Sequence, residues 1–443
     1  MTDAAKATTK AEAAAPGLAK TALLMLPLQA LFRGGEAVLP LLLAAWFGRS
    51  AETDLYYLLA AYFVFAGALL TGAFQDSAVV PVLIEVQATD AKRFPEIAGS
   101  LLGHTLAIGA VVAVVAGAVA AVLAVSTSPL RALALQLILL MSVFLLVTAV
   151  RAFYVGLLNA RGRFSAHPVA SGLGVGLTLL IIFLFRGMLG VSVIPLALLA
   201  GEIVATTLLS LFSARAVHFW IVPNLARPEP VRRLFKLVRL EVTGSLITRI
   251  NPVIDQLMAG LAAVIGGGTL LRYASDVASL PTSILQAALF PVFLTRLAQE
   301  AARPAQFAST LRRTLATVVA LLLVLSALFA LFRVPLCRLL FLHGEMDEAG
   351  VLRIANILVW GLLGVAPFGA LLVLARAHIA RQNSRIMPSM GILNAALNVV
   401  FNAAFVGILG LGGIALSTSA TYLVIAVVFW MRLPKDARSL APR

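Results

Sequence analysis

Cysteine and charge are the scarcest features of this 443-residue chain. Cys337 is its only cysteine, so no intrachain disulfide can form and no cysteine cluster can hold a metal. Charged residues make up 12% of the chain and hydrophobic residues 61%, whereas an ordinary soluble domain has about 25% and 45–50%. A soluble protein of this composition would expose apolar surface everywhere, so the composition excludes one.

Motifs for nucleotide hydrolysis and covalent catalysis are also missing. The sequence has no P-loop, no H-E-x-x-H pair and no G-x-S-x-G elbow, so ATP-driven transport and hydrolytic chemistry have no support. We expect a protein that is not an enzyme, with no catalytic residue, no metal site and no cofactor. His104 stands alone among apolar residues, and we interpret it as structural.

Long apolar runs dominate what is present. A helix needs about 20 apolar residues to cross a hydrocarbon core of about 30 Å. The pattern therefore predicts an all-α polytopic membrane protein. We expect about twelve transmembrane helices, at residues 21–47, 55–83, 98–124, 132–158, 168–187, 190–213, 239–265, 267–295, 311–335, 352–378, 387–409 and 411–432. Residues 1–20 are polar, with no short apolar segment before a cleavage site, and predict an uncleaved cytoplasmic tail.

Positive charge is distributed unevenly between the predicted loops. The net charge of +15 could suit a nucleic acid, but most lysines and arginines fall at the two termini and in the even-numbered loops. That asymmetry predicts that both termini lie in the cytoplasm, and we expect no nucleic-acid partner. The most basic segment, residues 227–239, lies between the two halves of the chain, and we interpret it as a topology determinant attracted to anionic membrane lipids.

The two halves of the chain repeat weakly. Arg161 and Pro168 follow the fourth predicted span, and Arg381 and Pro388 follow the tenth, an offset of 220 residues (381 − 161 = 220). A second similarity links the ends of the second and eighth spans. We therefore predict two six-helix bundles related by a parallel repeat, at residues 21–225 and 226–443, the second beginning with the basic linker. Two such bundles with a cleft between them are typical of transporters that work by alternating access, and a duplicated scaffold that moves nothing is the alternative.

Charged residues in the first predicted span indicate a cavity-lining helix. Arg33 and Glu36 are three residues apart and share a helix face, where they can pair. Gly34 and Gly35 weaken the helix between them, and Pro40 removes a backbone donor one turn later. We expect these three residues to act as a hinge.

Further polar residues concentrate in the first two spans of each half. Charges at membrane depth are costly unless paired or hydrated and indicate function. Arginine suits phosphate because its planar fork donates two hydrogen bonds, and acidic residues could tune that charge or bind a coupling cation. The candidate cavity residues outside the first span are Asp54, Asp76, Arg151, Arg249, Asp255, Arg272 and Asp276, and Glu202 is a further charge in the sixth span.

An ordered set of short matches resembles one family. The matching residues are Phe32–Arg33, Ala45–Gly48, Thr53–Asp54, Gly72–Phe74, Val80–Pro81, Asn159–Pro168, Ile254–Asp255, Arg272–Asp276, Leu280–Pro281, Phe290–Pro291 and Leu340–Gly344. Together they resemble the MurJ/MviN-like lipid II flippases of the multidrug/oligosaccharidyl-lipid/polysaccharide (MOP) exporter superfamily, over about residues 30–430.

The resemblance implies export of a polyprenyl-diphosphate-linked sugar, lipid II or a related glycan, from the inner to the outer leaflet of a bacterial inner membrane. Arg33 matches the family's first cavity arginine, and Asp54 its acidic residue between the first two helices. This chain departs from the family at Leu39, where an arginine is usual, and at Asp276, which replaces a cation by an anion. Transport could be coupled to a monovalent cation, a proton or the membrane potential, and cell-envelope synthesis proteins are possible partners. An ion-coupled multidrug exporter and a non-transporting membrane scaffold are the alternatives.

Overall fold

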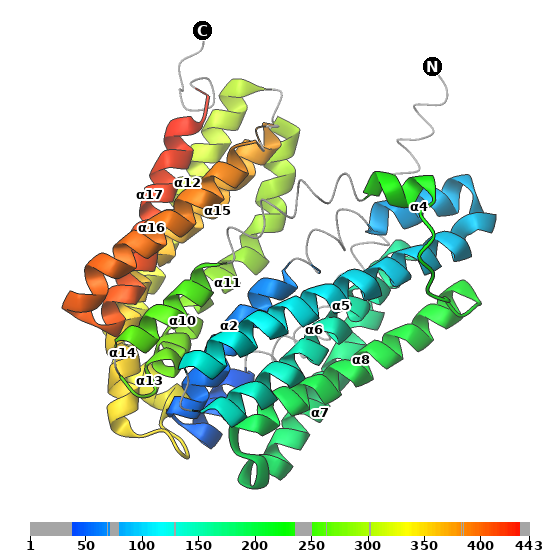
Figure 1. Cartoon of the computed structure of the whole chain (residues 1–443). Coiled ribbons are helices and arrows are strands. Elements are labelled where there is room, and N and C mark those ends of the chain that lie inside the picture. Colours follow the sequence, from blue (N-terminus) through cyan, green and yellow to red (C-terminus); the bar gives the residue numbers. More distant parts are fainter. Residues whose placement is uncertain are drawn as a thin grey trace. The chain divides into compact units, whose positions relative to one another are not determined.

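The computed structural model describes residues 38–68, 70, 79–127, 130–234, 250–262, 264–300, 303–381, 383 and 385–434, and every regular element among them is a helix (Figure 1). The predicted tail 1–20 and six candidate residues lie outside the described residues. These six are Arg33, Gly34, Gly35, Glu36, Asp76 and Arg249.

Contacts divide the chain into two compact units, each of which is described by itself. The first consists of Met1–Leu42, Leu70–Thr127 and Leu135–Val238, and the second of Leu43–Leu69, Ser128–Ala134 and Arg239–Arg443, with structure described only within the ranges given above. The second unit therefore includes a segment from the start of the chain, Leu43–Leu69, as well as the C-terminal half.

The first unit is built on long, apolar helices. Its elements are α4 (Val80–Thr89), η2 (Ala91–Arg93), α5 (Phe94–Thr127), α6 (Arg131–Ala160), α7 (Ala166–Leu189), η3 (Gly190–Ser192) and α8 (Val193–Val217). Helices α7 and α8 form a tight hairpin, because a Cβ on Gly174 would lie 2.6 Å from the carbonyl oxygen of Gly201. Small residues at this crossing let the two backbones approach closely, as in many membrane helix pairs.

The segment that leaves α8 is fixed across α5 in the same unit. The backbone amide of Asn224 donates to the carbonyl of Gly99 at 3.0 Å, and the hydroxyl of Ser100 donates to the carbonyl of Ala226 at 2.5 Å. Further along, Arg233 donates to both oxygens of Glu85, each at 2.6 Å. The start of the basic linker is thus held by specific bonds rather than by charge alone.

The second unit contains the helix Val38–Phe47 from Leu43 onward and the remaining helices. These are α2 (Ala51–Gly67), α10 (Asn251–Leu261), α11 (Gly267–Glu300), α12 (Pro304–Leu331), α13 (Arg333–Phe341), α14 (Glu348–Leu362), α15 (Val365–Ala380), α16 (Ile386–Leu409) and α17 (Leu411–Arg432). Helix α2 packs on α10 and α11, which brings a segment from the start of the chain into the C-terminal half.

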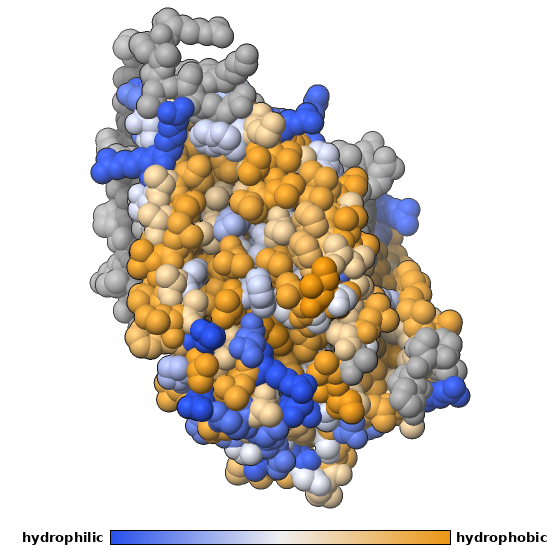
Figure 2. All heavy atoms as spheres, turned by 90° about the vertical axis from the view of Figure 1, so that its left-hand side faces the viewer, coloured by the Kyte–Doolittle hydropathy of each residue, from blue (hydrophilic) through white to orange (hydrophobic). Residues whose placement is uncertain are grey.

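Length and hydropathy support a multi-pass membrane protein. Within the described ranges six helices are long and apolar enough to cross a membrane, or up to seven if the bent pair of α14 and α15 is one span. Figure 2 shows a face of the molecule on which hydrophobic residues cover the middle and hydrophilic residues gather toward the ends. That distribution fits contact with a hydrocarbon core between two polar interfaces. The predicted all-α, polytopic class is confirmed.

Two predicted spans differ from the structure because proline and glycine interrupt them. Residues 352–378, predicted as one helix, form α14 and α15, which are bent by 41°. Pro367 lacks the N–H that a continuous helix would use, and a Cβ on Gly364 would lie 2.6 Å from the Ser419 hydroxyl. Residues 311–335 likewise form α12 and the start of α13, with Pro335 in the first turn of α13.

Candidate functional site

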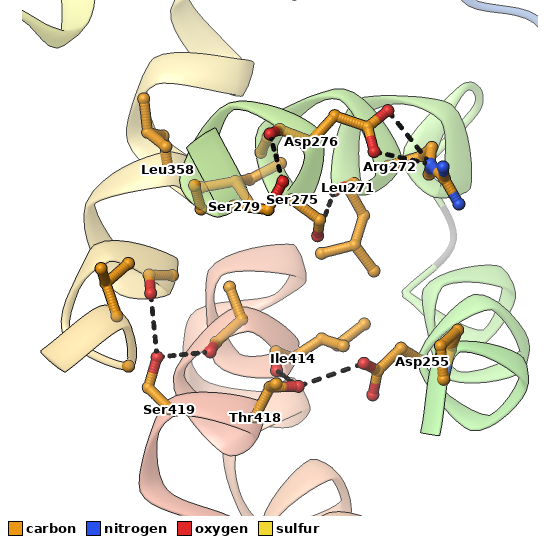
Figure 3. Close-up of a pocket in the computed structure, with 18 of the residues that line it drawn as sticks. Asp255, Leu271, Arg272, Ser275, Asp276, Ser279, Leu358, Ile414, Thr418 and Ser419 are labelled. Carbon is orange, nitrogen blue, oxygen red and sulfur yellow. Dashed lines mark hydrogen bonds and ion pairs between the residues drawn. The ribbon is translucent and has the colours of Figure 1, made fainter. Parts of the chain in front are cut away.

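A cavity of about 340 Å³ lies within the second unit. Helices α2, α10, α11, α14, α15 and α17 all contribute to its wall, and Figure 3 shows its labelled polar side chains arranged around it. The polar residues that line it are Asp255, Gln256, Arg272, Ser275, Asp276, Ser279, Thr282, Thr418, Ser419 and Tyr422. Three of the candidate residues predicted from the sequence, Asp255, Arg272 and Asp276, therefore lie in one cavity.

Asp255 is a carboxylate held by neutral donors. Its Oδ1 accepts hydrogen bonds from the Nδ2 atoms of Asn398 at 3.1 Å and Asn402 at 3.0 Å. Its Oδ2 accepts from the Thr418 hydroxyl at 3.1 Å (Figure 3). Three donors from α16 and α17 therefore bind the carboxylate, and no described cation pairs with it.

The sequence contains a signal for these partners, although no charged residue marks them. Asn394, Asn398 and Asn402 recur every fourth residue along the apolar helix α16, so they share one face, and all three are buried. A buried stripe of amides in a membrane helix indicates a polar partner on the facing helix. The identity of that partner could not be predicted, because Asp255 precedes Asn398 by 143 residues.

Arg272 and Asp276 form an ion pair on one face of α11. Arg272 Nε lies 3.0 Å from Asp276 Oδ1, and the two side chains are 45% and 31% exposed. Both residues line the cavity. The four-residue spacing aligns the two side chains along the helix, so the arginine does not present an unbalanced positive charge to the cavity.

The break between α14 and α15 leaves backbone carbonyl groups free to accept hydrogen bonds from α17. The Ser419 hydroxyl donates to the Trp360 carbonyl at 2.7 Å, near the end of α14, and Gly361 and Gly364 both line the cavity. Interrupted membrane helices of this kind often mark binding sites, because unwound backbone is tolerated only where it faces protein or a water-filled cavity.

Asp54 has a different place from the other predicted site residues. Its Oδ1 accepts from the backbone N–H and from the hydroxyl of Thr269, both at 2.8 Å, and the Thr269 hydroxyl oxygen lies 2.9 Å from that of Thr53. This carboxylate accepts a hydrogen bond from a backbone N–H at the start of α11, and the positive end of the α11 dipole stabilises its negative charge. Asp54 therefore fastens the start of α2 to the start of α11.

A second contact at the same loops joins Arg49 to Asp347. The Nε and Nη2 atoms of Arg49 donate to the two carboxylate oxygens of Asp347, each at 3.0 Å. This bond, together with the N–H of Gly350, lowers the pKa of Asp347 to about 2. Gly344 lies so close to the carbonyl of Ala45 that a side chain there would collide with it.

Arg151 lies in another cavity, within the first unit. This cavity has a volume of about 230 Å³ and is lined by α6, α7 and α8 together with Leu39. Arg151 Nε donates to Glu202 Oε1, and the two side chains are 25% and 11% exposed. Arg151 thus belongs to a different unit from Asp255, Arg272 and Asp276. Its partner, Glu202, is a charge of the sixth predicted span, and the sequence alone does not show that the two pair.

Pro40 lies in the first described turn of the helix Val38–Phe47. Its role as a hinge with Gly34 and Gly35 stays a prediction, as does the pairing of Arg33 with Glu36. The described structure therefore brings together three of the predicted cavity residues, places Arg151 in its own pocket and assigns Asp54 to a helix terminus.

The sequence matches the family model described as the lipid II flippase MurJ over residues 43–442. The chain belongs to the MurJ family. A MurJ lipid II flippase in an inward closed conformation has a similar structure, with a TM-score of 0.75 at 17% identity, covering 94% of this chain and 89% of that one. No curated protein matches the sequence.

Transporters of the MOP superfamily share the fold of this MurJ-family chain. A multidrug resistance MATE family transporter in an inward-facing conformation has a TM-score of 0.69 at 14% identity and covers 91% of this chain and 93% of its own. A MOP superfamily transporter from Pyrococcus furiosus has a TM-score of 0.65 at 16% identity, with 92% and 91% covered. Membership of the MurJ family makes the protein a multi-pass membrane flippase of a lipid-linked precursor.

Proposed function

We propose that this MurJ-family protein moves a polyprenyl-diphosphate-linked sugar, lipid II or a related lipid-linked glycan, from the inner to the outer leaflet by alternating access. The observation that carries the proposal is the family match over residues 43–442. In this proposal residues 21–225 and 226–443 form two six-helix bundles, with twelve spans in all, and the substrate headgroup enters a cleft between them.

The parallel repeat is supported by two helices of equal length. Helix α7 spans Ala166–Leu189 and α16 spans Ile386–Leu409, and both ends are shifted by 220 residues (386 − 166 and 409 − 189). Each helix ends at a glycine with positive φ, 54° at Gly190 and 55° at Gly410, a conformation that residues with a side chain rarely adopt. The same hairpin geometry therefore occurs once in each half.

Arginines would hold the diphosphate. Arg33 and Arg249 are proposed from the sequence, and Arg151 from its cavity in the first unit. Because Arg151 is bound to Glu202 through Nε, a phosphate oxygen would have to share or replace that carboxylate. An anion can do so since a bidentate phosphate contact is as strong as a carboxylate contact.

Asp255 is the site that we propose for coupling. In the structure its three partners donate to it, and the Oδ1 of Asn402 has no hydrogen-bond partner although the residue is fully buried. Rotation of that amide would turn Oδ1 toward Asp255, so that carboxylate, amide and hydroxyl oxygens could surround a monovalent cation. A proton on Asp255 would be the simplest alternative occupant, and dependence on the membrane potential would follow in either case.

The surroundings of the protein follow from the same proposal. We place it in a bacterial inner membrane with both termini in the cytoplasm. Anionic lipids would contact the basic residues of 227–239, and cell-envelope synthesis proteins would supply or consume the lipid-linked substrate.

Reconstitution into vesicles tests the function directly. The purified chain is placed in proteoliposomes with a fluorescent polyprenyl-diphosphate-linked sugar, and leaflet exposure is measured with a membrane-impermeant quencher. We expect the native chain to move the lipid, Arg33→Ala to abolish movement without loss of folded protein, and Arg353→Ala, an exposed arginine on α14, to keep it. Full activity of Arg33→Ala would remove that residue from the substrate site.

The two alternative functions give opposite results in the same vesicles and in cells. A multidrug exporter would move cationic dyes and leave the lipid in place, and its deletion would raise drug susceptibility. A scaffold would move neither. An unchanged leaflet distribution of lipid-linked precursors after depletion of the protein would contradict every flippase version.

A further inference from the structure

The polar groups around the cavity of the second unit are mostly acceptors. Three hydroxyls on α11 donate their proton to the backbone of their own helix: Ser275 to Leu271, Ser279 to Asp276 and Thr282 to Ser279, each at 2.8 Å. The hydroxyls of Ser419 and Thr418 donate to the Trp360 carbonyl and to Asp255. What these groups can still offer a ligand is the lone pairs of their oxygens.

The charge of the cavity points the same way. Its lining contains two carboxylates, Asp255 and Asp276, and one guanidinium, Arg272, which leave one negative charge (2 − 1 = 1). If a cation or proton neutralises Asp255, the cavity is neutral. In neither state does the cavity carry the surplus positive charge that a diphosphate requires. The phosphate oxygens are also hydrogen-bond acceptors, so they would find no donors among the acceptor oxygens of this wall.

An aromatic pair forms part of the wall. The rings of Phe368 on α15 and Tyr422 on α17 lie with centroids 4.8 Å apart and planes tilted by 38°, and both residues line the cavity. Aromatic surface beside carboxylate and hydroxyl acceptors suits a pyranose ring, because such a ring has an apolar C–H face and a rim of O–H and N–H donors. The volume of about 340 Å³ lies within the range of small-molecule pockets, about 300–1,000 Å³.

We infer that this cavity is the subsite for an uncharged sugar ring of the headgroup, with Asp276 accepting its hydroxyl or amide protons and the Phe368–Tyr422 pair packing on its apolar face. Arg272 is a positioning residue, since it fixes the Asp276 carboxylate by its 3.1 Å bond from Nε to Oδ2. The inference rests on the proposed function. It separates the recognition of the sugar, in the second unit, from that of the diphosphate by the arginines named above.

Two lipids that differ only by the sugar test it. The purified full chain in nanodiscs is titrated with a polyprenyl diphosphate and with the same lipid carrying one N-acetylhexosamine, and both dissociation constants are measured. We expect the native chain to prefer the sugar-bearing lipid, and Asp276→Asn to reduce that preference by about tenfold, since a charge-assisted acceptor is lost. Tyr422→Leu should also reduce the preference, with the affinity for the sugar-free lipid unchanged in both variants.

A pair of serines provides the test if Asp276→Asn fails to fold. Ser275→Ala with Ser279→Ala removes two acceptors but no charge and should lower the preference several-fold. The matched control is Ser389→Ala, because Ser389 is exposed and makes the same bond to its own helix, to Ile386 at 2.8 Å, outside the cavity. An equal loss of affinity for both lipids, or no loss for either, would overturn the sugar subsite.

Failure of the proposed function has a different signature. A native chain that moves neither lipid across a vesicle membrane would contradict the flippase proposal. A native chain that moves both lipids and binds them with equal affinity would leave that proposal standing and overturn only the subsite.

Discussion

The two units compensate the partly buried charges of their helices in different ways. In the first, Arg151 on α6 is bound to Glu202 on α8, a partner of opposite charge. In the second, Asp255 on α10 is bound by two amides and a hydroxyl, all neutral. We therefore propose that an anion shares or replaces Glu202 at Arg151, and that a cation binds Asp255 when its neutral partners turn. In the proposed function, the first unit would exchange its carboxylate for an anionic group and the second would take up a cation.

The helices are packed more tightly around Arg151 than around Asp255. Helices α7 and α8, beside Arg151, meet at glycines with no space for a side chain. The cavity beside Asp255 is larger and is crossed by the bent pair of α14 and α15. We expect the first unit to respond to changes in volume and the second to changes in hydrogen-bonding groups.

The largest expected effect comes from Asp255. Asp255→Asn removes the only carboxylate among the four side chains of its cluster and leaves Asn398, Asn402 and Thr418 without a charged acceptor. Lipid movement driven by a cation gradient should fall on the order of tenfold or more, measured in proteoliposomes with sodium or proton gradients. The control is Asn394→Ala, one turn earlier on α16. Unchanged gradient dependence in Asp255→Asn would break the contrast between the units.

The ion pair of the first unit should show the cost of an uncompensated charge. Arg151→Leu or Glu202→Leu alone should lower the free energy of unfolding by about 2–3 kcal/mol, and the double variant should cost less than the sum, because the pair is partly buried. Chemical unfolding of the native chain and the three variants in detergent gives the double-mutant cycle. Additive losses would mean that the two side chains contribute independently.

The close crossing of α7 and α8 at their glycines tests whether the first unit is sensitive to added volume. Gly174→Ala should destabilise the protein by about 1–3 kcal/mol, since the added Cβ would lie 2.6 Å from the Gly201 carbonyl oxygen. Gly176→Ala on the same helix is the matched control, because nothing lies within 4 Å of its added Cβ. It should be neutral or slightly stabilising. Similar losses in both variants would show that the close crossing of α7 and α8 is not the cause.

The smallest expected effect is that of the Arg49–Asp347 pair. Because the pKa of Asp347 is lowered to about 2 from an ordinary value of about 3.9, its contribution to stability is present above about pH 4. It is lost as the pH falls toward 2. Asp347→Asn should therefore lower the free energy of unfolding by no more than about 1 kcal/mol at neutral pH, since the pair is exposed, and by nothing near pH 2. An Asp347→Asn effect that persists at pH 2 would show that the bond does not depend on charge.

Particular helices show how far the sequence predicted the fold. Residues 411–432 were predicted as a span and form α17 with the same bounds, and 387–409 form α16 to within one residue. Both runs are apolar and follow a glycine or a polar loop, so local composition determines their ends. The sequence did not predict the break within 352–378. A hydropathy average includes Gly364 and Pro367 as ordinary positions and does not detect that α17 packs against the backbone there.

The candidate site was predicted in its charged residues and missed in its neutral ones. Asp255, Arg272 and Asp276 were identified because charges in apolar runs are rare. Asn398, Asn402 and Thr418 were not, since amides and hydroxyls are common in membrane helices and acquire a role only through the helix they face. Asp54, a further candidate cavity residue, is bonded to Thr269 at the start of α11, and its place in the substrate cavity stays a prediction.

The sequence by itself determined that the chain spans a membrane with many helices and that it resembles MurJ-type flippases, because hydropathy and ordered motifs are local properties. Only the tertiary structure decided which charges meet. It paired Arg151 with Glu202, surrounded Asp255 with neutral donors and turned the hydroxyls of α11 into a wall of acceptors. The physical reason is that a buried charge is compensated by whichever group another helix brings within hydrogen-bonding distance, and that depends on packing between segments far apart in the chain.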